Sequence, residues 1–182
     1  MDHIDILGTP IPNAGPVFFA ALAIHVTAGI TCVSCGAIAA LTRKESPLHR
    51  RFGRVYLWAW AVVYLTLTVM SAIRWRENVH LFVIGTLGFA AALTGYANRR
   101  RRPDLHILAM GASYVLVLTG FYVDNGPHLP LWDRLPTVAY WLLPALIGFP
   151  LIARAIARRR HRRAGTSVIT GDGASKHSAA RR

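Results

Sequence analysis

The chain has 182 residues, of which 53% are hydrophobic, and a formal net charge of +13. The apolar residues stand in long blocks, not in the period-3.6 or period-2 stripes of a soluble domain, and this excludes an ordinary soluble fold. The basic residues are divided between the flanks of these blocks. That division excludes the continuous basic face that a nucleic-acid-binding protein presents.

Residues 1–16 precede the first apolar block and predict a short external segment. Asp2 and Asp5 stand where a cleavable signal peptide carries basic residues, and the block that follows is longer than the apolar region of such a peptide. We therefore expect this block to remain as the first transmembrane helix.

Five apolar blocks of 25, 19, 19, 19 and 22 residues follow one another along the chain. A helix rises about 1.5 Å per residue and the hydrocarbon core is about 30 Å thick, so each block is long enough to span a bilayer. The sequence therefore predicts an all-α transmembrane domain over residues 17–163. Its five helices are expected at 17–41, 55–73, 79–97, 105–123 and 136–157. Residues 164–182 are rich in small and polar residues and predict a disordered cytoplasmic tail.

The flanking charges predict the orientation of the helices. Eighteen of the 21 basic residues lie on one side of the predicted spans, together with three acids, whereas the other side has three basic and five acidic residues. Cytoplasmic loops carry the excess of lysine and arginine. The pattern predicts an N-out, C-in protein, which requires an odd number of spans. Ser46 and Pro47 also predict a helix start before the second block, as an N-cap and a first helical residue.

His25 lies near the middle of the first predicted helix, where an ionisable group is costly and is a functional candidate. Gly29, Cys32 and Gly36 share its helical face and favour close packing of another helix. Two interpretations stay open: a neutral imidazole that hydrogen-bonds across a helix interface, or a ligand or proton-handling group. His80, at the outer end of the third helix, is a second candidate if it meets His25.

A polar cluster on the cytoplasmic side contains His49, Arg50, Arg54 and Tyr56, and His106 opens the fourth predicted helix on the same side. Two helix N-termini and several cations therefore converge at this rim. Such a place suits an anion, either a lipid headgroup or a small soluble anion. The alternative is that these residues only set the topology and contact lipid headgroups.

These motifs resemble a bacterial family of predicted membrane proteins catalogued as domain of unknown function 2306. The similar segments are His25-x3-Gly29-x6-Gly36, His49-Arg50-x2-Gly53-Arg54-x-Tyr56, and the later His106. The resemblance covers residues 20–123 and implies a multi-pass bundle in the bacterial inner membrane, with no established activity. The chain departs from the family after His106, where Ile107 stands in place of the family's arginine.

Two functions remain open. The first is a non-enzymatic or transport-type membrane protein with an intramembrane histidine and a basic cytoplasmic pocket for an anion or lipid headgroup. The second is a b-type haem electron carrier, with His25 and His80 as candidate metal ligands. An enzyme acting on lipid is less favoured, because the sequence shows no nucleophile–base pair and no catalytic residue is assigned. Cys32 and Cys35 are interpreted as small buried residues.

We predict that reporter fusions at Arg102 and at Arg163 both report a cytoplasmic location. The physical reason is the 18-to-3 division of basic residues between the two sides. A fusion at Arg76, in the short connection on the opposite side, is the matched control and should report an external location. An external signal from the fusion at Arg102 would contradict the predicted orientation.

Overall fold

Within the part of the chain that the structure describes, five helices are long and apolar enough to cross a membrane. The computed structural model describes the backbone of residues 3–6, 9–12, 15–130 and 134–179, and the side chains of residues 15–130 and 134–162. The helices are α1 (Pro16–Leu41), α2 (Pro47–Ile73), α3 (Trp75–Ala97), α4 (Pro103–Asn125) and α5 (Thr137–Ala179). A short 3-10 turn, Gly126–His128, follows α4. The predicted helical bundle of five possible spans is therefore confirmed.

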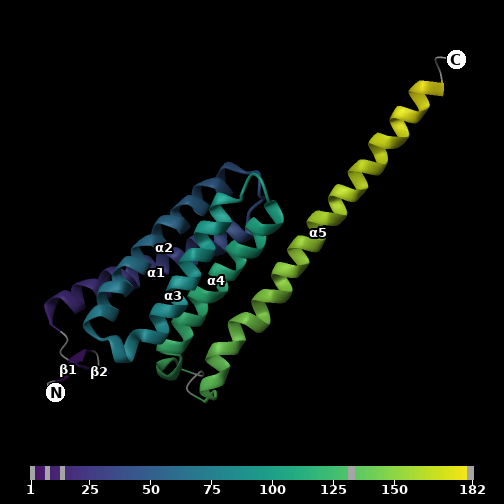
Figure 1. The fold of residues 1–182 in the computed structure, drawn as a ribbon. Coiled ribbons are helices and arrows are strands. Elements are labelled where there is room, and N and C mark those ends of the chain that lie inside the picture. The colour runs from purple at the N-terminus through teal and green to yellow at the C-terminus, as the bar shows by residue number, and fades with distance from the viewer. Residues whose placement is uncertain (1–2, 7–8, 13–14, 131–133, 180–182) are drawn as a thin grey trace.

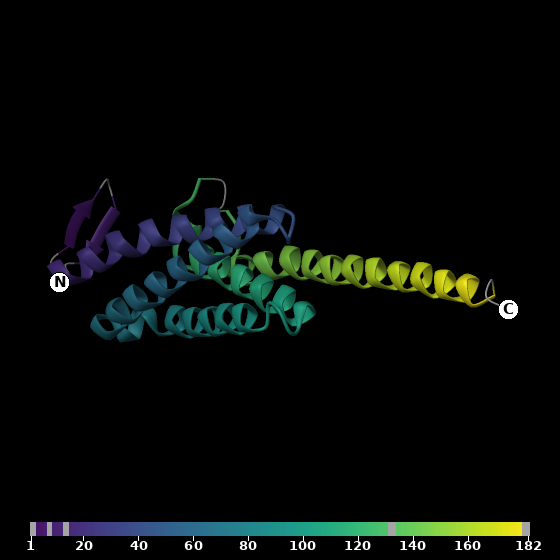
Figure 2. The same ribbon diagram turned by 90° about the horizontal axis from the view of Figure 1, so that it is seen from above.

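The helices pack in chain order (Figure 1). Each of α1 to α4 lies against the next helix, and α1 also touches α4, so these four helices form the bundle. α5 packs against α4 on the outside of this bundle. Its C-terminal part extends past the other helices, as the view from above shows (Figure 2). The helices that begin at the same end of the bundle are α2 and α4, which positions the candidate site described below.

Local sequence signals explain where the helices begin. The Ser46 side chain accepts a hydrogen bond from the backbone N–H of His49 at 3.1 Å, and Pro47 is the first residue of α2. α4 likewise begins with a proline, Pro103. Proline suits this position because the first helical N–H has no partner within the helix. The predicted early start of the second helix is confirmed.

Two terminal features differ from the prediction. Residues His3–Ile6 (β1) and Thr9–Pro12 (β2) form an antiparallel hairpin within the predicted external segment, so the chain is not entirely helical. The alternation of polar and apolar residues in 3–6 is the period-2 pattern of a strand. α5 also continues to Ala179, whereas a disordered tail was predicted from residue 164. The alanine- and arginine-rich stretch at 152–164 has high helix propensity and extends the helix beyond the apolar block.

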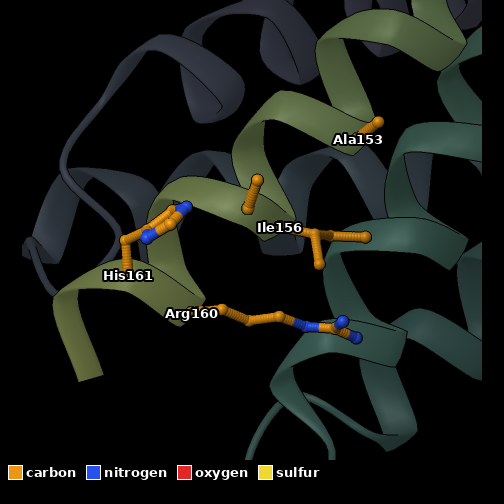
Figure 3. Close-up of a pocket in the computed structure, with 5 residues that line it drawn as sticks. Ala153, Ile156, Arg160 and His161 are labelled. Carbon is orange, nitrogen blue, oxygen red and sulfur yellow. The ribbon is translucent and has the colours of Figure 1, made fainter. Parts of the chain in front are cut away.

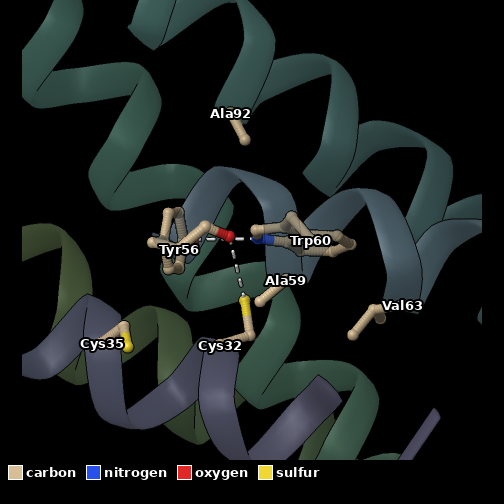
Figure 4. Packing of buried hydrophobic residues seen from close by; sticks show 7 residues of the cluster. All are labelled: Cys32, Cys35, Tyr56, Ala59, Trp60, Val63 and Ala92. Carbon is tan, nitrogen blue, oxygen red and sulfur yellow. Dashed lines mark hydrogen bonds between the residues drawn. The ribbon is translucent and has the colours of Figure 1, made fainter. Parts of the chain in front are cut away.

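At the centre of the bundle, two aromatic side chains of α2 are joined by a hydrogen bond between their polar groups (Figure 4). Tyr56 and Trp60 are almost completely buried, and the indole N–H of Trp60 donates to the Tyr56 hydroxyl at 2.9 Å. The Tyr56 hydroxyl lies 2.7 Å from the Ser113 hydroxyl on α4, and Ser113 donates to the carbonyl of Met110. The buried polar groups therefore satisfy one another, as they must in a site without water.

Small residues let the large rings enter the helix contacts. A Cβ atom at Gly36 of α1 would lie 2.9 Å from the Tyr56 ring and 2.7 Å from the Tyr114 ring. A Cβ atom at Gly88 of α3 would lie 2.6 Å from the Trp60 ring. Helices in lipid associate through close packing, because lipid removes most of the hydrophobic drive between them. The expected small-residue contact of α1 is thus confirmed at Gly36 but not at Gly29, where an added Cβ would meet nothing within 4 Å.

We predict that Tyr56→Phe lowers the stability of the bundle by about 1–3 kcal/mol, because the Trp60 N–H loses its acceptor in a dry site. The thermal unfolding midpoint of the purified protein in detergent measures this loss. Tyr96→Phe is the matched control, since the Tyr96 hydroxyl makes no hydrogen bond among the described residues. Equal midpoints for the two variants would show that the buried network contributes nothing to stability.

Candidate functional site

Two histidines meet at the end of the bundle where α2 and α4 begin. The His49 Nδ1 atom lies 2.8 Å from the carbonyl oxygen of Ala39, near the end of α1. The His106 Nδ1 atom lies 2.8 Å from the carbonyl oxygen of Gly95, near the end of α3. The two imidazole rings are neighbours, with centroids 6.4 Å apart and planes nearly perpendicular at 80°. We call this end of the bundle the α2/α4 rim.

The hydrogen bonds determine the tautomer of both rings. A carbonyl oxygen only accepts, so Nδ1 of His49 and Nδ1 of His106 each carry the hydrogen. In a neutral imidazole the Nε2 atom then keeps its lone pair. Both side chains are half-buried. The rim therefore presents two oriented imidazoles, each with one nitrogen available to bind a ligand or a proton.

Other cations surround this pair. Lys44, in the connection before α2, and Arg99, after α3, both lie within electrostatic range of His106. Partial withdrawal from water lowers the pKa of Lys44, and the nearby Arg159 lowers it further, more than Asp104 offsets. Positive charge at the rim is therefore incompletely neutralised.

Asp104 is the acidic partner at the rim. Its carboxylate pairs with Arg159, and its second oxygen accepts a hydrogen bond from Nε of Arg160 at 3.1 Å. Figure 3 shows Arg160 extending from α5 toward the neighbouring helix, beside a shallow apolar groove that also includes Ile156 and His161. Because Asp104 already contacts two arginines, it leaves Lys44 without full compensation.

The predicted rim cluster is only partly assembled. His49 and His106 come together, as the convergence of two helix starts predicted. Arg50 and Arg54 are exposed and lie outside this contact. Tyr56 was predicted to line the rim pocket, and this is wrong, because its ring is buried in the core with 2% of its surface exposed. Its position seven residues after His49 places it two helical turns further into the bundle.

His25 pairs across the α1–α2 contact. Its Nδ1 atom lies 2.9 Å from the Thr66 hydroxyl, which itself donates to the carbonyls of Val62 and Val63. The hydroxyl hydrogen is thus used within α2, so His25 donates and Thr66 accepts. The predicted pairing with a polar group of a neighbouring helix is confirmed. The sequence did not single out Thr66 as this partner, because a threonine hydroxyl in a helix is usually bonded to its own backbone.

His80 does not meet His25, which was the condition for its role as a second candidate. His80 is exposed on α3, and its ring lies 6.2 Å from the ring of Trp141 on α5. Asp124 interacts electrostatically with both histidines, so all three lie toward the same end. Among the described residues, no group of three or more histidine, cysteine or carboxylate side chains is close enough to hold a metal ion.

The two cysteines lie in the core. Cys32 is fully buried and Cys35 nearly so, and both are free thiols. The Cys32 thiol lies 3.9 Å from the backbone carbonyl oxygen of Tyr56, within the range of a weak S–H donor. Figure 4 shows both on the α1 face of the central cluster. Their surroundings agree with their interpretation as small packing residues.

Sequence reasoning missed four contributors to these sites. Lys44 lies in the connection before α2, so only the approach of the two hairpins brings it to His106, whereas Arg99 lies in the same hairpin as His106. Thr66 showed no distinguishing signal. Asp104 did show a distinguishing signal in the sequence, since it is an acid among many basic residues on its side of the predicted spans.

No protein-family model, curated protein or solved structure matches this chain.

We predict that Thr66→Val destabilises the bundle more than His25→Leu does. The first change leaves the His25 N–H without an acceptor, at a cost of about 1–3 kcal/mol, whereas the second leaves Thr66 bonded within α2. Thermal unfolding of both variants in detergent, together with the double variant, measures the difference. The double variant should unfold above Thr66→Val alone, and strictly additive losses would show that the two side chains do not interact.

Proposed function

We propose that this chain is a non-enzymatic, multi-pass protein of the bacterial inner membrane, of ligand-binding or transport type, that binds an anionic group at its cytoplasmic rim. The proposed orientation has the N-terminus outside and the C-terminus in the cytoplasm. The division of basic residues and the odd number of possible spans support it. The α2/α4 rim then faces the cytoplasm, and its partners are the anionic lipid headgroups or the small anions found there.

The observation that carries the proposal is the excess of positive charge around His106. Lys44 and Arg99 lie within electrostatic range of this ring, while Asp104 is already engaged by two arginines of α5. An oxyanion bound at the rim would neutralise this excess positive charge. Lipid phosphates and small carboxylates carry this charge, and lysine and arginine donate charge-assisted hydrogen bonds to both.

The side chains, and not the helix N-termini, carry this proposal. The N-terminus of α2 is capped by the Ser46 hydroxyl, and the first turn of α4 contains Asp104. The Ser46 hydroxyl and the Asp104 carboxylate therefore already compensate the partial positive charge at the N-terminus of their helix. Arg50 and Arg54 are exposed on α2 and add general attraction to an anionic membrane surface.

We predict that Lys44→Ala weakens binding of short-chain phosphatidylglycerol about fivefold, since one partly exposed ion pair contributes about 1 kcal/mol. The purified protein in detergent is titrated with the lipid, and intrinsic tryptophan fluorescence or a thermal shift follows binding. Affinity should also fall as the pH rises toward the lowered pKa of Lys44, because only the ammonium form attracts the anion.

Arg51→Ala is the matched control, because Arg51 is exposed on the same side and its removal changes the net charge equally. Short-chain phosphatidylcholine tests for binding to the acyl chains alone, and inorganic phosphate tests for a small anion. Equal weakening by the two variants would mean that only the net charge acts and would overturn a defined site. Phosphate binding without preference for phosphatidylglycerol would identify the ligand as a soluble anion.

A further inference from the structure

We propose that His49 and His106 are the two axial ligands of a b-type haem at the α2/α4 rim. This pair differs from His25 and His80, the candidate ligands considered from the sequence, which the fold does not join. The proposal deepens the anion site, because it rests on the same cations to receive the two carboxylates of the haem. Its remaining support comes from the geometry of the two rings and their surroundings.

The first support is the orientation of the imidazoles. Each Nδ1 atom donates to a backbone carbonyl, at 2.8 Å to Ala39 and at 2.8 Å to Gly95. Histidines that bind metals almost always use their other ring N–H in this way, because the second hydrogen bond sets the tautomer and holds the ring. His49 and His106 each keep Nε2 as the coordinating atom. Two neighbouring rings are therefore both held in the tautomer that a metal ligand requires.

The second support is the distance between the rings. A metal–nitrogen bond of about 2.0 Å on each side, together with about 1.1 Å from ring nitrogen to ring centre, separates two trans imidazoles by about 6.2 Å. The centroids of His49 and His106 are 6.4 Å apart, with the ring planes nearly perpendicular. The distance between the ring centres therefore matches the separation of two imidazoles on opposite sides of one metal ion.

The third support distinguishes haem from a bare metal ion. Structural zinc needs four ligands and catalytic zinc needs three from the protein, and no such group is found among the described residues. Haem iron already has four pyrrole nitrogens, so two histidines complete its coordination. Lys44 and Arg99 would repel a bare cation from this place, whereas they attract the two propionates of haem.

The fourth support is the space beside the ligands. Gly53 lies four residues after His49, on the same helical face of α2. A Cβ atom there would meet nothing within 4 Å, in contrast to the tightly filled contacts at Gly36 and Gly88. The open side at Gly53 is where the edge of a planar macrocycle can lie. A bulky side chain at this position should compete with the haem without touching either ligand.

The test is a titration of the full-length protein, purified in detergent, with hemin, followed by visible spectroscopy in the oxidised and reduced states. We expect one haem per chain with the spectrum of six-coordinate, low-spin, bis-histidine haem. His49→Ala and His106→Ala should each lower hemin affinity about a hundredfold or more. His106→Met should retain haem with a shifted spectrum and a raised potential, as methionine ligation does. His128→Ala, at the opposite end of the protein, should bind hemin normally.

The second pair of variants tests the space instead of the ligands. Gly53→Leu should prevent hemin binding, whereas Gly29→Leu on α1, which also meets open space, should leave it unchanged. Circular dichroism and elution volume verify that each variant is folded. Unchanged hemin binding in the folded Gly53→Leu variant, or in the two alanine variants, would overturn the proposal. Binding of one copper or zinc ion per chain, with no Soret band from haem, would overturn the haem proposal as well.

The outcomes also separate this inference from the proposed anion site. If hemin fails to bind while Lys44→Ala still weakens phosphatidylglycerol binding, the haem proposal is wrong and the anion site stands. If bis-histidine haem forms while Lys44→Ala has no effect on the lipid, the anion site is wrong and the histidine ligands stand without it. In the combined case, Lys44→Ala weakens hemin binding and leaves the bis-histidine spectrum unchanged.

Discussion

The buried hydrogen bond between Tyr56 and Ser113 is the interaction on which the arrangement of the bundle depends. It joins α2 to α4 at the centre of the protein, and the Trp60 N–H completes it from the same helix. In an apolar interior, a phenol without a partner is costly, so the two helices cannot separate or slide without losing several satisfied groups together. The glycine at position 36 makes this possible by allowing α1 to approach the Tyr56 ring.

The same contact sets the geometry of the rim. Tyr56 lies seven residues after His49 on α2, and Ser113 lies seven residues after His106 on α4. Seven residues are close to two helical turns, so on each helix both positions share one face. Pairing the inner positions therefore brings the outer positions opposite one another. The carbonyls of the preceding helices then orient the two imidazoles, which connects each helical hairpin to the site.

Much of the fold was predictable because helices that are long and apolar enough to cross a membrane leave long apolar runs in the sequence. The apolar blocks and the Ser46-Pro47 start indicated five helices, and the structure has them. The site was less predictable. Tyr56 was expected at the rim because it stands close in sequence to basic residues, yet the rise of two turns along α2 places it in the core. His25 was correctly expected to face a neighbouring helix, while its partner Thr66 carried no sign in the sequence.

The sequence by itself determined the number and approximate positions of the possible spans, the start of the second helix and the unequal distribution of charge. These follow from local properties, namely the length of apolar runs, capping chemistry and the cost of placing charge in lipid. Only the tertiary structure decided which histidines meet. His25 and His80 remain apart, whereas His49 and His106 become neighbours although 57 positions separate them in the chain. The reason is that side-chain pairing depends on the rotation and register of packed helices, and these are set by contacts such as Tyr56 with Ser113.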